Sequence, residues 1–244
     1  ERVGHRYGVA SYALEKTDIV FEDGKTYALL GPSGCGKTTM LNIISGLLYP
    51  SDGRVLVGGE DATQTPTAKR NIAQVFQFPV IYQSKTVYEN LAFPLRCRGW
   101  EKSRIEPRVT EIADLLGLSS RLGQSSRRLT ADEKQLISLG RGLVRNDVSA
   151  LLMDEPLTVI DPRMKFDLRR RIKQASDKMR HTVVYVTHDQ NEAMTLADEV
   201  LVMSAGRVVQ HSTPQDLFEN PRNHYVGNFI GSPGMNFFGV ERRD

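Results

Sequence analysis

The residues from position 31 to 38 carry the chemistry best suited to binding a phosphate group. They read Gly-Pro-Ser-Gly-Cys-Gly-Lys-Thr, which fits the phosphate-loop pattern of two glycines with four residues between them, followed by lysine and a hydroxyl residue. Glycines let backbone N–H groups turn inward around phosphate oxygens, and a helix beginning near Lys37 points its positive end at the same anion. Lys37 can reach the β and γ phosphates of a nucleotide, and the Thr38 hydroxyl can coordinate Mg²⁺. A glycine-rich turn before a helix would explain the glycines without a ligand. The residues expected around the phosphates are Gly31, Pro32, Ser33, Gly34, Cys35, Gly36, Lys37, Thr38 and Thr39.

Two adjacent carboxylates follow a second apolar run, residues 151–153. If that run is a strand, its end would bring Asp154 beside the phosphate loop, where the carboxylate can hold Mg²⁺ through water. Glu155 can then orient and deprotonate an attacking water. Two acids after a strand are more often a solvated strand end, but the phosphate loop favours the catalytic interpretation.

The elements that must position these groups are strands alternating with helices, which predicts an α/β fold with a mainly parallel sheet covered by helices. The expected strands are 12–21, 26–30, 54–57, 71–76, 150–153, 182–186 and 199–203, and the expected helices are 39–48, 163–179, 192–197 and 214–229. Residues 206–210 complete a hairpin with the strand before them.

Between residues 78 and 147 the pattern is helical and contains no convincing strand, which predicts a helical subdomain inserted in the sheet. One helix covers 105–116 and ends at Gly117. Either Ser103 caps this helix with Glu106 as its capping-box partner, or Pro107 occupies its first turn. A second helix starts near Thr130 and runs toward residue 146.

Composition excludes several classes of protein. The chain has 244 residues, with 32 Lys and Arg against 29 Asp and Glu, and is 40% hydrophobic, which is ordinary for a globular protein with a sizeable core. A net charge of +3 gives no reason to expect nucleic acid. Two cysteines, Cys35 and Cys97, offer no disulfide framework and fit a reducing compartment. No apolar run approaches a membrane span, and the first residues are not a signal peptide, so a membrane role would be exerted from the aqueous side through partners.

Taken in this order, the motifs resemble those of the ATP-binding cassette (ABC) ATPases, over essentially the whole chain. Residues 75–77 resemble the glutamine loop, which implies that Gln77 contacts Mg²⁺ and the attacking water and links the site to the helical subdomain. Residues 185–189 resemble the switch-histidine loop, which implies that His188 contacts the γ-phosphate; a lone histidine after a strand is otherwise usually a capped or satisfied one. Residues 158–161, ending in Asp161, resemble the loop that crosses the dimer interface.

Near the start of the chain, residues 5–8 resemble the aromatic loop that stacks on adenine. Tyr7 is the first choice for this role and Tyr12 the second, although a tyrosine near the first strand could equally belong to the core. The resemblance implies a RecA-like core with an antiparallel β flank. Residues 1–78 would form its first part, 79–148 the helical subdomain with the signature region, and 149–244 the second part and the C-terminal tail.

The C-terminal motifs, residues 214–221 and 229–236, resemble the end of the cassette in importers of sugars, polyols and glycerol phosphate. A small β-rich regulatory domain usually follows in those proteins, and the chain ends at Asp244, too soon to contain it. The start is also short of the family's usual first strand.

The family's signature, Leu-Ser-Gly-Gly-Gln, clamps the ATP held by the opposite subunit, and here the sequence departs from it. The aligned residues are Leu129, Thr130, Ala131, Asp132 and Glu133. The leucine is kept and threonine is a fair hydroxyl substitute, but both glycines are lost. The same stretch also predicts a capping box between Thr130 and Glu133, and Asp132 in the first turn suits the helix dipole. The capping box and Asp132 occupy the positive end of the helix, which would otherwise meet the γ-phosphate. A carboxylate at that place competes with the phosphate. The variant resembles one associated with importers of glycerol or related polyols, whose two ATPase subunits can differ.

The resemblance implies ATP hydrolysis, with ATP and Mg²⁺ as cofactors, driving import of a carbohydrate, polyol or glycerol-type solute. Two ATP molecules would lie between this chain and a second ABC ATPase subunit, identical or different. The pair would sit peripherally on the cytoplasmic face of the inner membrane, bound to transmembrane permease subunits and served indirectly by an extracytoplasmic solute-binding protein. Residues 78–82 would line the groove for the permease's coupling helix, or else belong to the core. Two rivals remain: a soluble cassette ATPase acting on DNA or ribosomes, and a regulatory subunit that holds ATP but hydrolyses little.

Overall fold

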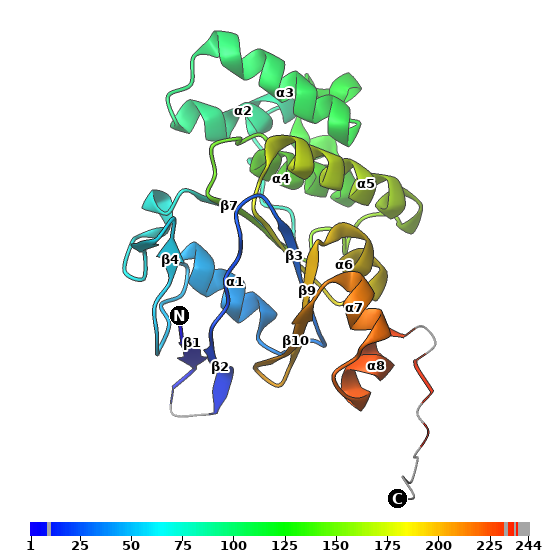
Figure 1. Cartoon of the computed structure of the whole chain (residues 1–244). Helices are drawn as coiled ribbons and strands as arrows, with labels where there is room; N and C mark the ends of the chain where they lie inside the picture. Colours follow the sequence, from blue (N-terminus) through cyan, green and yellow to red (C-terminus); the bar gives the residue numbers. More distant parts are fainter. Residues whose placement is uncertain (9–10, 232–233, 237, 239–244) are drawn as a thin grey trace, which may run out of the picture.

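A six-stranded sheet forms the centre of the computed structural model, which describes residues 1–8, 11–231, 234–236 and 238 (Figure 1). The strand order is β10-β9-β3-β8-β7-β6, and only the β10–β9 pair in this sheet is antiparallel. The α/β prediction is therefore confirmed. The strands are β3 (Thr26–Leu30), β6 (Ile72–Val75), β7 (Ala150–Asp154), β8 (Val183–Thr187), β9 (Glu199–Ser204) and β10 (Arg207–Ser212).

Successive residues of the central strands face different layers, as the strand period of two requires. On β7, Leu151 packs in one apolar cluster with the helices α2 (Val87–Cys97), α3 (Lys102–Leu116), α4 (Ala131–Leu143) and α5 (Pro162–Met179). Leu152 instead packs in the cluster that contains α1 (Lys37–Ser45). Because β3 and β8 are buried at every residue, both faces of the sheet are covered.

The expected antiparallel flank consists of two separate hairpins. Strands β1 (Val3–Arg6) and β2 (Tyr12–Thr17) pair with each other, and β4 (Leu56–Val57) pairs with β5 (Glu60–Asp61). Two of these strands are shorter than expected. The strand expected over 12–21 ends at Thr17, and the one expected over 54–57 begins at Leu56.

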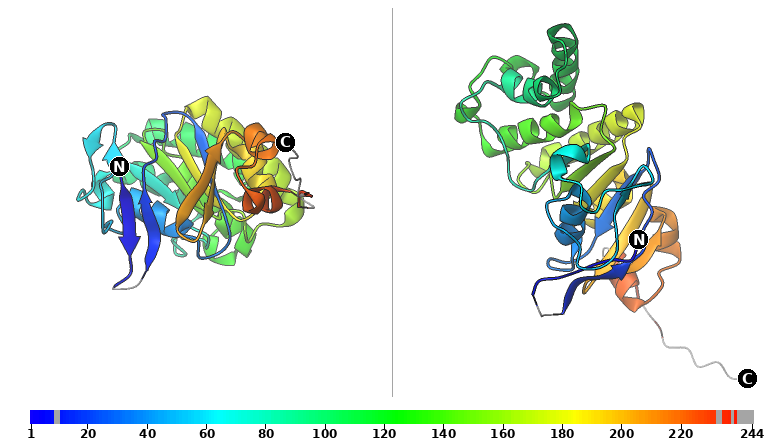
Figure 2. Two further views of the ribbon diagram at one scale, coloured as in Figure 1. Left: turned by 60° about the horizontal axis from the view of Figure 1, so that its bottom comes forward. Right: turned by 90° about the vertical axis from the view of Figure 1, so that its left-hand side faces the viewer.

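Helices α2, α3 and α4 form a layer at one end of the molecule, seen from the side in Figure 2. Three short 3-10 helices also occur: η1 (Thr67–Lys69), η2 (Ser119–Arg121) and η3 (Ser126–Arg128). The side chains of α4 pack in one cluster with Ala73 and Val75 of the edge strand β6 and with α2. The signature helix is thus packed directly against the strand that leads into the glutamine loop.

Both expected starts for α3 are wrong. The helix begins at Lys102 and its N-cap is Glu101, which makes no side-chain capping hydrogen bond. Ser103 therefore lies inside the first turn rather than before it, and Pro107 lies beyond that turn on the exposed side of the helix. Water can satisfy the carbonyl that a proline nitrogen leaves unpaired there. The predicted end is confirmed, since Gly117 adopts the left-handed conformation with φ of 69°.

The C-terminal region adds α6 (Gln190–Leu196), α7 (Pro214–Glu219) and α8 (His224–Ile230), which pack around β9 and β10. The first of the two C-terminal importer motifs forms α7. The second, residues 229–236, includes positions 232 and 233, which lie outside the described residues.

The buried side chain of Arg70 fastens the C-terminal end of α1 to the loop before β6. Its guanidinium donates to the backbone oxygens of Ile43 at 2.7 Å, Ile44 at 2.9 Å, Thr63 at 2.8 Å and Thr65 at 2.8 Å. Within the described part of the chain it has no acidic partner. A cation at this helix end also complements the helix dipole.

Candidate nucleotide site

The phosphate loop joins the end of β3 to the start of α1, and close packing dictates its glycines. A side chain at Gly31 would place Cβ 2.4 Å from the Met203 oxygen, and one at Gly36 would place it 2.6 Å from the Ala13 oxygen. Gly36 is the N-cap of α1, with φ of 103°, and makes no side-chain capping bond. The first turn of α1 contains no acid. Its free N–H groups and positive dipole end therefore remain available to an anion.

Lys37 lies folded across this loop. Its ammonium donates to the backbone oxygens of Gly31 at 2.7 Å and Pro32 at 2.9 Å, and its Nζ lies 3.8 Å from the Cys35 sulfur. The residue is buried, and no ion pair to it occurs in the described part of the structure. A buried cation that has no acidic partner in this part of the structure is placed to meet a phosphate inside the loop.

Thr38 and Asp154, the two oxygen-bearing residues expected at a metal, contact each other. The Thr38 hydroxyl donates to the Asp154 carboxylate, with distances of 3.0 and 3.3 Å to its two oxygens. Burial raises the pKa of the Asp154 carboxyl above its ordinary value, against the opposing effects of the Thr38 hydrogen bond and the Lys37 charge. Among the described residues, no group of three or more His, Cys, Asp or Glu side chains could hold a metal alone. An oxygen pair of this kind fits Mg²⁺, which takes few protein ligands and completes its shell with phosphates and water.

Three of the predicted catalytic side chains meet at one oxygen atom. Oε2 of Glu155 accepts a hydrogen bond from Nε2 of Gln77 at 3.3 Å and lies 3.0 Å from Nδ1 of His188. Glu155 adopts φ of 44°, which is uncommon for a residue with a side chain, and its N–H donates to the Val186 oxygen at 2.9 Å. The strained backbone turns this carboxylate toward the ends of β6 and β8.

Tyr7, the first choice for stacking on adenine, lies beside the start of α1. Its hydroxyl is 3.2 Å from the Thr39 hydroxyl, its ring packs edge-on against His5, and the residue is 57% exposed. Tyr12 donates instead to Asp52 at 2.8 Å and is covered by the Arg6 guanidinium. The exposed ring near the phosphate loop is therefore that of Tyr7.

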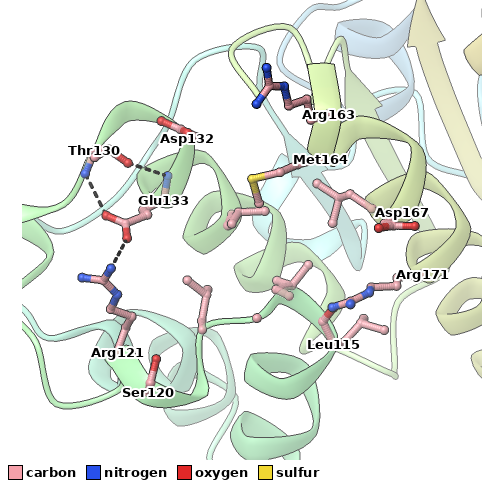
Figure 3. Close-up of a pocket in the computed structure, with 15 residues that line it drawn as sticks. Leu115, Ser120, Arg121, Thr130, Asp132, Glu133, Arg163, Met164, Asp167 and Arg171 are labelled. Atoms are coloured by element: carbon pink, nitrogen blue, oxygen red, sulfur yellow. Dashed lines mark hydrogen bonds and ion pairs between the residues drawn. The ribbon is translucent and has the colours of Figure 1, made fainter. Parts of the chain in front are cut away.

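The signature residues start α4 and form the predicted capping box (Figure 3). The Glu133 N–H donates to the Thr130 hydroxyl at 3.4 Å, and the Thr130 N–H donates to the Glu133 carboxylate at 3.0 Å. Arg121 pairs with the same carboxylate at 3.1 Å. Asp132 lines a neighbouring cleft of about 600 Å³ between α3, α4 and α5. Among the described residues, no hydrogen bond or ion pair joins residues 129–133 to residues 31–39, so one chain does not bring the two motifs together.

Asp161 and the segment after Gln77 both reach the surface of the chain, in part. Asp161 is exposed and is the N-cap of α5, where its side chain accepts from the Arg163 N–H at 2.8 Å. Phe78 is 68% exposed and Val80 is 51% exposed, so these two side chains are not core. Ile81, in contrast, packs against the apolar cluster of α2 and α4.

Glu192 is a buried acid near His188 that the sequence analysis did not identify. Glu192 of α6 is 4% exposed and accepts hydrogen bonds from the Tyr185 hydroxyl at 2.9 Å and the Thr187 hydroxyl at 2.8 Å. These bonds anchor the strand end that carries His188. The available signal was a carboxylate four residues after the histidine, on a short helix beside apolar residues.

No helix among the described residues combines the length and apolar character needed to cross a bilayer.

Known proteins match this chain along most of its length. A family model described as ABC transporter matches residues 14–158. The trehalose/maltose import ATP-binding protein MalK of Thermococcus litoralis is 41% identical over 231 residues, covering 92% of this chain and 62% of that protein. The trehalose import ATP-binding protein SugC of Mycobacterium tuberculosis is 41% identical over 238 residues, covering 98% and 60%. The chain thus spans less than two thirds of these relatives. The structure of cbiO1 from Clostridium perfringens, part of the ABC transporter complex cbiONQ, superposes with a TM-score of 0.80 at 24% identity, over 90% of this chain and 89% of that one, which supports the fold.

Proposed function

Because this chain belongs to the ABC transporter family, we propose that it is the ATP-hydrolysing subunit of an importer for a sugar-type solute, with a polyol or glycerol-type solute as the narrower possibility. The observation that carries the proposal is the meeting of Gln77 and His188 at one oxygen of Glu155, at 3.3 and 3.0 Å. A carboxylate held in this way can accept a proton from water. The names of the two sugar importers described above support the solute class.

In the proposed reaction the phosphate loop binds the phosphates of ATP, and Lys37 balances their charge. Thr38, Asp154 and Gln77 would hold Mg²⁺, which when bound neutralises charge on the phosphates. Glu155 orients and deprotonates the water, and His188 holds the same Glu155 oxygen that Gln77 contacts. Tyr7 stacks on the adenine.

A second cassette subunit is part of this proposal, because no hydrogen bond or ion pair among the described residues joins residues 129–133 to the phosphate loop of the same chain. Each ATP would lie between the phosphate loop of one chain and residues 129–133 of the other. The first turn of α4 carries Asp132 and Glu133, and its capping box already occupies donors that a phosphate would need. We therefore expect the ATP site completed by this signature to close less tightly than the second ATP site. A different partner chain would supply the signature of that second site.

Permease subunits are the remaining partners, and they would place the assembly at the cytoplasmic face of the membrane. The exposed side chains of Phe78 and Val80 support this, because they lie one and three residues after Gln77 and offer an apolar surface to a coupling helix. The Arg141 guanidinium donates to the Val80 oxygen at 2.6 Å and covers the Tyr82 ring, which holds this segment in place. The solute-binding protein would meet the permease and not this chain.

The test compares three proteins: the wild type, Lys37→Ala and Glu155→Gln. Binding of a fluorescent ATP analogue with Mg²⁺ is measured first, and phosphate release is then measured in the complex assembled with the permease subunits. Lys37→Ala should abolish tight binding. Glu155→Gln should bind ATP, fail to hydrolyse it and accumulate as an ATP-bound dimer. Hydrolysis by Glu155→Gln at the wild-type rate would remove Glu155 as the base, and absence of hydrolysis in the assembled wild type would refute the function.

A further inference from the structure

Gln135 is a buried residue of α4 that contacts both catalytic loops of its own chain. It is 1% exposed. Its side-chain Nε2 donates to the backbone oxygen of Phe76 at 3.0 Å and to that of Pro156 at 2.9 Å. Phe76 directly precedes Gln77, and Pro156 directly follows Glu155. One amide group therefore holds the backbone on either side of the Gln77–Glu155 hydrogen bond.

Among the described residues, the hydrogen bond from Gln77 to Glu155 is the only one that joins these two loops directly. They leave the ends of the neighbouring strands β6 and β7, whose described pairing ends with Val75 opposite Met153. Beyond that point the Gln77–Glu155 contact, at 3.3 Å, depends on where each loop turns. The two hydrogen bonds from Gln135 join the loops just beyond the end of the β6–β7 pairing.

The chemistry of glutamine suits this task at a cost in stability. A single nitrogen supplies both donors. The Oε1 atom of the same amide is buried and has no hydrogen-bond partner within the described part of the chain. An unpaired buried acceptor is unfavourable, so an apolar residue of this size would pack without that penalty but would leave both carbonyls unpaired.

We propose that Gln135 is a positioning residue for ATP hydrolysis, which fixes the Gln77 and Glu155 side chains through the backbones beside them. The inference rests on the proposed function. Because the signature residues 129–133 lead into α4 and form its first turn, a shift of this helix passes to both catalytic loops through the same amide.

The test uses Gln135→Leu, Gln135→Glu and a matched control, Gln74→Leu. Gln74 lies on β6, donates to the Asn42 side chain at 3.3 Å, and also has a buried Oε1 without a partner among the described residues. Its side chain contacts neither catalytic loop by a hydrogen bond. ATP affinity and kcat are measured separately in the assembled complex. Gln135→Leu should lower kcat by about tenfold to a hundredfold, since small misplacements of catalytic groups have effects of this size, and should leave the Kd for ATP within about twofold. Gln74→Leu should leave kcat within about twofold.

Gln135→Glu gives a readout that a merely structural role would not produce. As a carboxylate, the new side chain faces two carbonyl oxygens and repels both; as a neutral acid, it donates one hydrogen bond. Burial favours the neutral acid, so the ratio of variant to wild-type kcat should rise as the pH falls from 8 to 6. This variant also decides the matter if Gln135→Leu does not fold.

Three results would overturn the positioning role. One is a wild-type kcat for Gln135→Leu, another is a parallel loss of ATP affinity and kcat in that variant, and the third is a ratio for Gln135→Glu that does not change with pH. Each requires a wild-type complex that hydrolyses ATP, so these failures are distinct from failure of the proposed function.

Discussion

Replacing Ala131 and Asp132 together with glycine tests whether the first turn of α4 can receive a phosphate from a partner chain. The Thr130–Glu133 capping box and the Arg121–Glu133 ion pair would remain, because neither uses the substituted side chains. Asp132 lies at the rim of the cleft in Figure 3 and makes no hydrogen bond or ion pair within the described residues. Among the described residues no cation pairs with its charge, which is favoured only by the dipole of α4.

The double substitution changes two free energies: that of association of the ATP-bound dimer and that of folding of the single chain. A carboxylate about 4 Å from a phosphate charge costs on the order of 4 kcal/mol at an effective dielectric of 20, and far less if water intervenes. This term opposes closure of the ATP-bound dimer, and a quarter of it, about 1 kcal/mol, corresponds to roughly a fivefold weaker association. Two glycines in α4 cost at most about 2 kcal/mol, and losing the helix-dipole interaction costs about 0.3–1 kcal/mol more. That second cost falls on folding, because α4 is present in both the open and the closed chain.

The assay measures ATP-driven dimerisation in the Glu155→Gln background by analytical ultracentrifugation, with the thermal midpoint recorded in parallel. The double glycine variant should associate at least about fivefold more tightly and unfold a few degrees earlier. Asp132→Asn is the matched control, because it removes the charge and keeps the helix-forming side chain. A glycine variant that associates less tightly, together with no effect of Asp132→Asn, would refute the reasoning. Residues 129–133 would then be a working signature whose acid points away from the phosphate.

Three further perturbations have definite expected outcomes. His188→Ala should lower kcat by about a hundredfold and leave the Kd for ATP nearly unchanged, because the imidazole contacts Glu155 at 3.0 Å; a large loss of ATP affinity in a binding titration would contradict this. Arg70→Leu should lower the free energy of unfolding by about 3–5 kcal/mol in urea, since four backbone oxygens lose a charged donor, and a change below about 1 kcal/mol would show that these bonds contribute little. Burial, aided by the nearby Arg108 charge, lowers the pKa of His181, so the unfolded chain binds a proton more readily than the folded one. The stability that neutral His181 contributes is complete above its unfolded pKa of about 6.5 and should be lost as the pH falls below that value, with a slope of at most about 1.4 kcal/mol per pH unit. Urea unfolding at pH 7.5 and 5.5 should show a smaller difference for His181→Gln than for the wild type, and equal differences would exclude this linkage.

Features governed by neighbouring residues could be predicted from the sequence. Gly34 and Gly36 have φ of 78° and 103°, which the local turn requires, and the Thr130–Glu133 capping box depends on two residues three positions apart. Strand alternation with helices gave the α/β class, because apolar runs of this length must be covered on both faces. The meeting of Gln77, Glu155 and His188 was expected from the family motifs and would not have been predicted from any one segment.

Features that depend on distant contacts were missed or misplaced. The start of α3 at Lys102 has no capping hydrogen bond to mark it, so the pattern of caps pointed to Ser103 or Pro107 instead. Gln135 resembles an ordinary polar residue in a helix, and its role appears only when two backbone oxygens, 59 residues before it and 21 residues after it, lie against its amide.

The place of β3 in the sheet has a consequence for synthesis of the chain. The strand that leads into the phosphate loop is buried along its whole length, yet both of its neighbours are encoded far downstream. The Gly24 N–H donates to the Thr182 hydroxyl, 158 residues later. At about 5–20 residues per second, a ribosome needs roughly 8–30 s to supply that partner. Throughout this interval the apolar strand has both edges unpaired, a state that invites aggregation. A fragment that stops before Val183 should therefore collect in inclusion bodies or bound to chaperones, and added ATP should not rescue it.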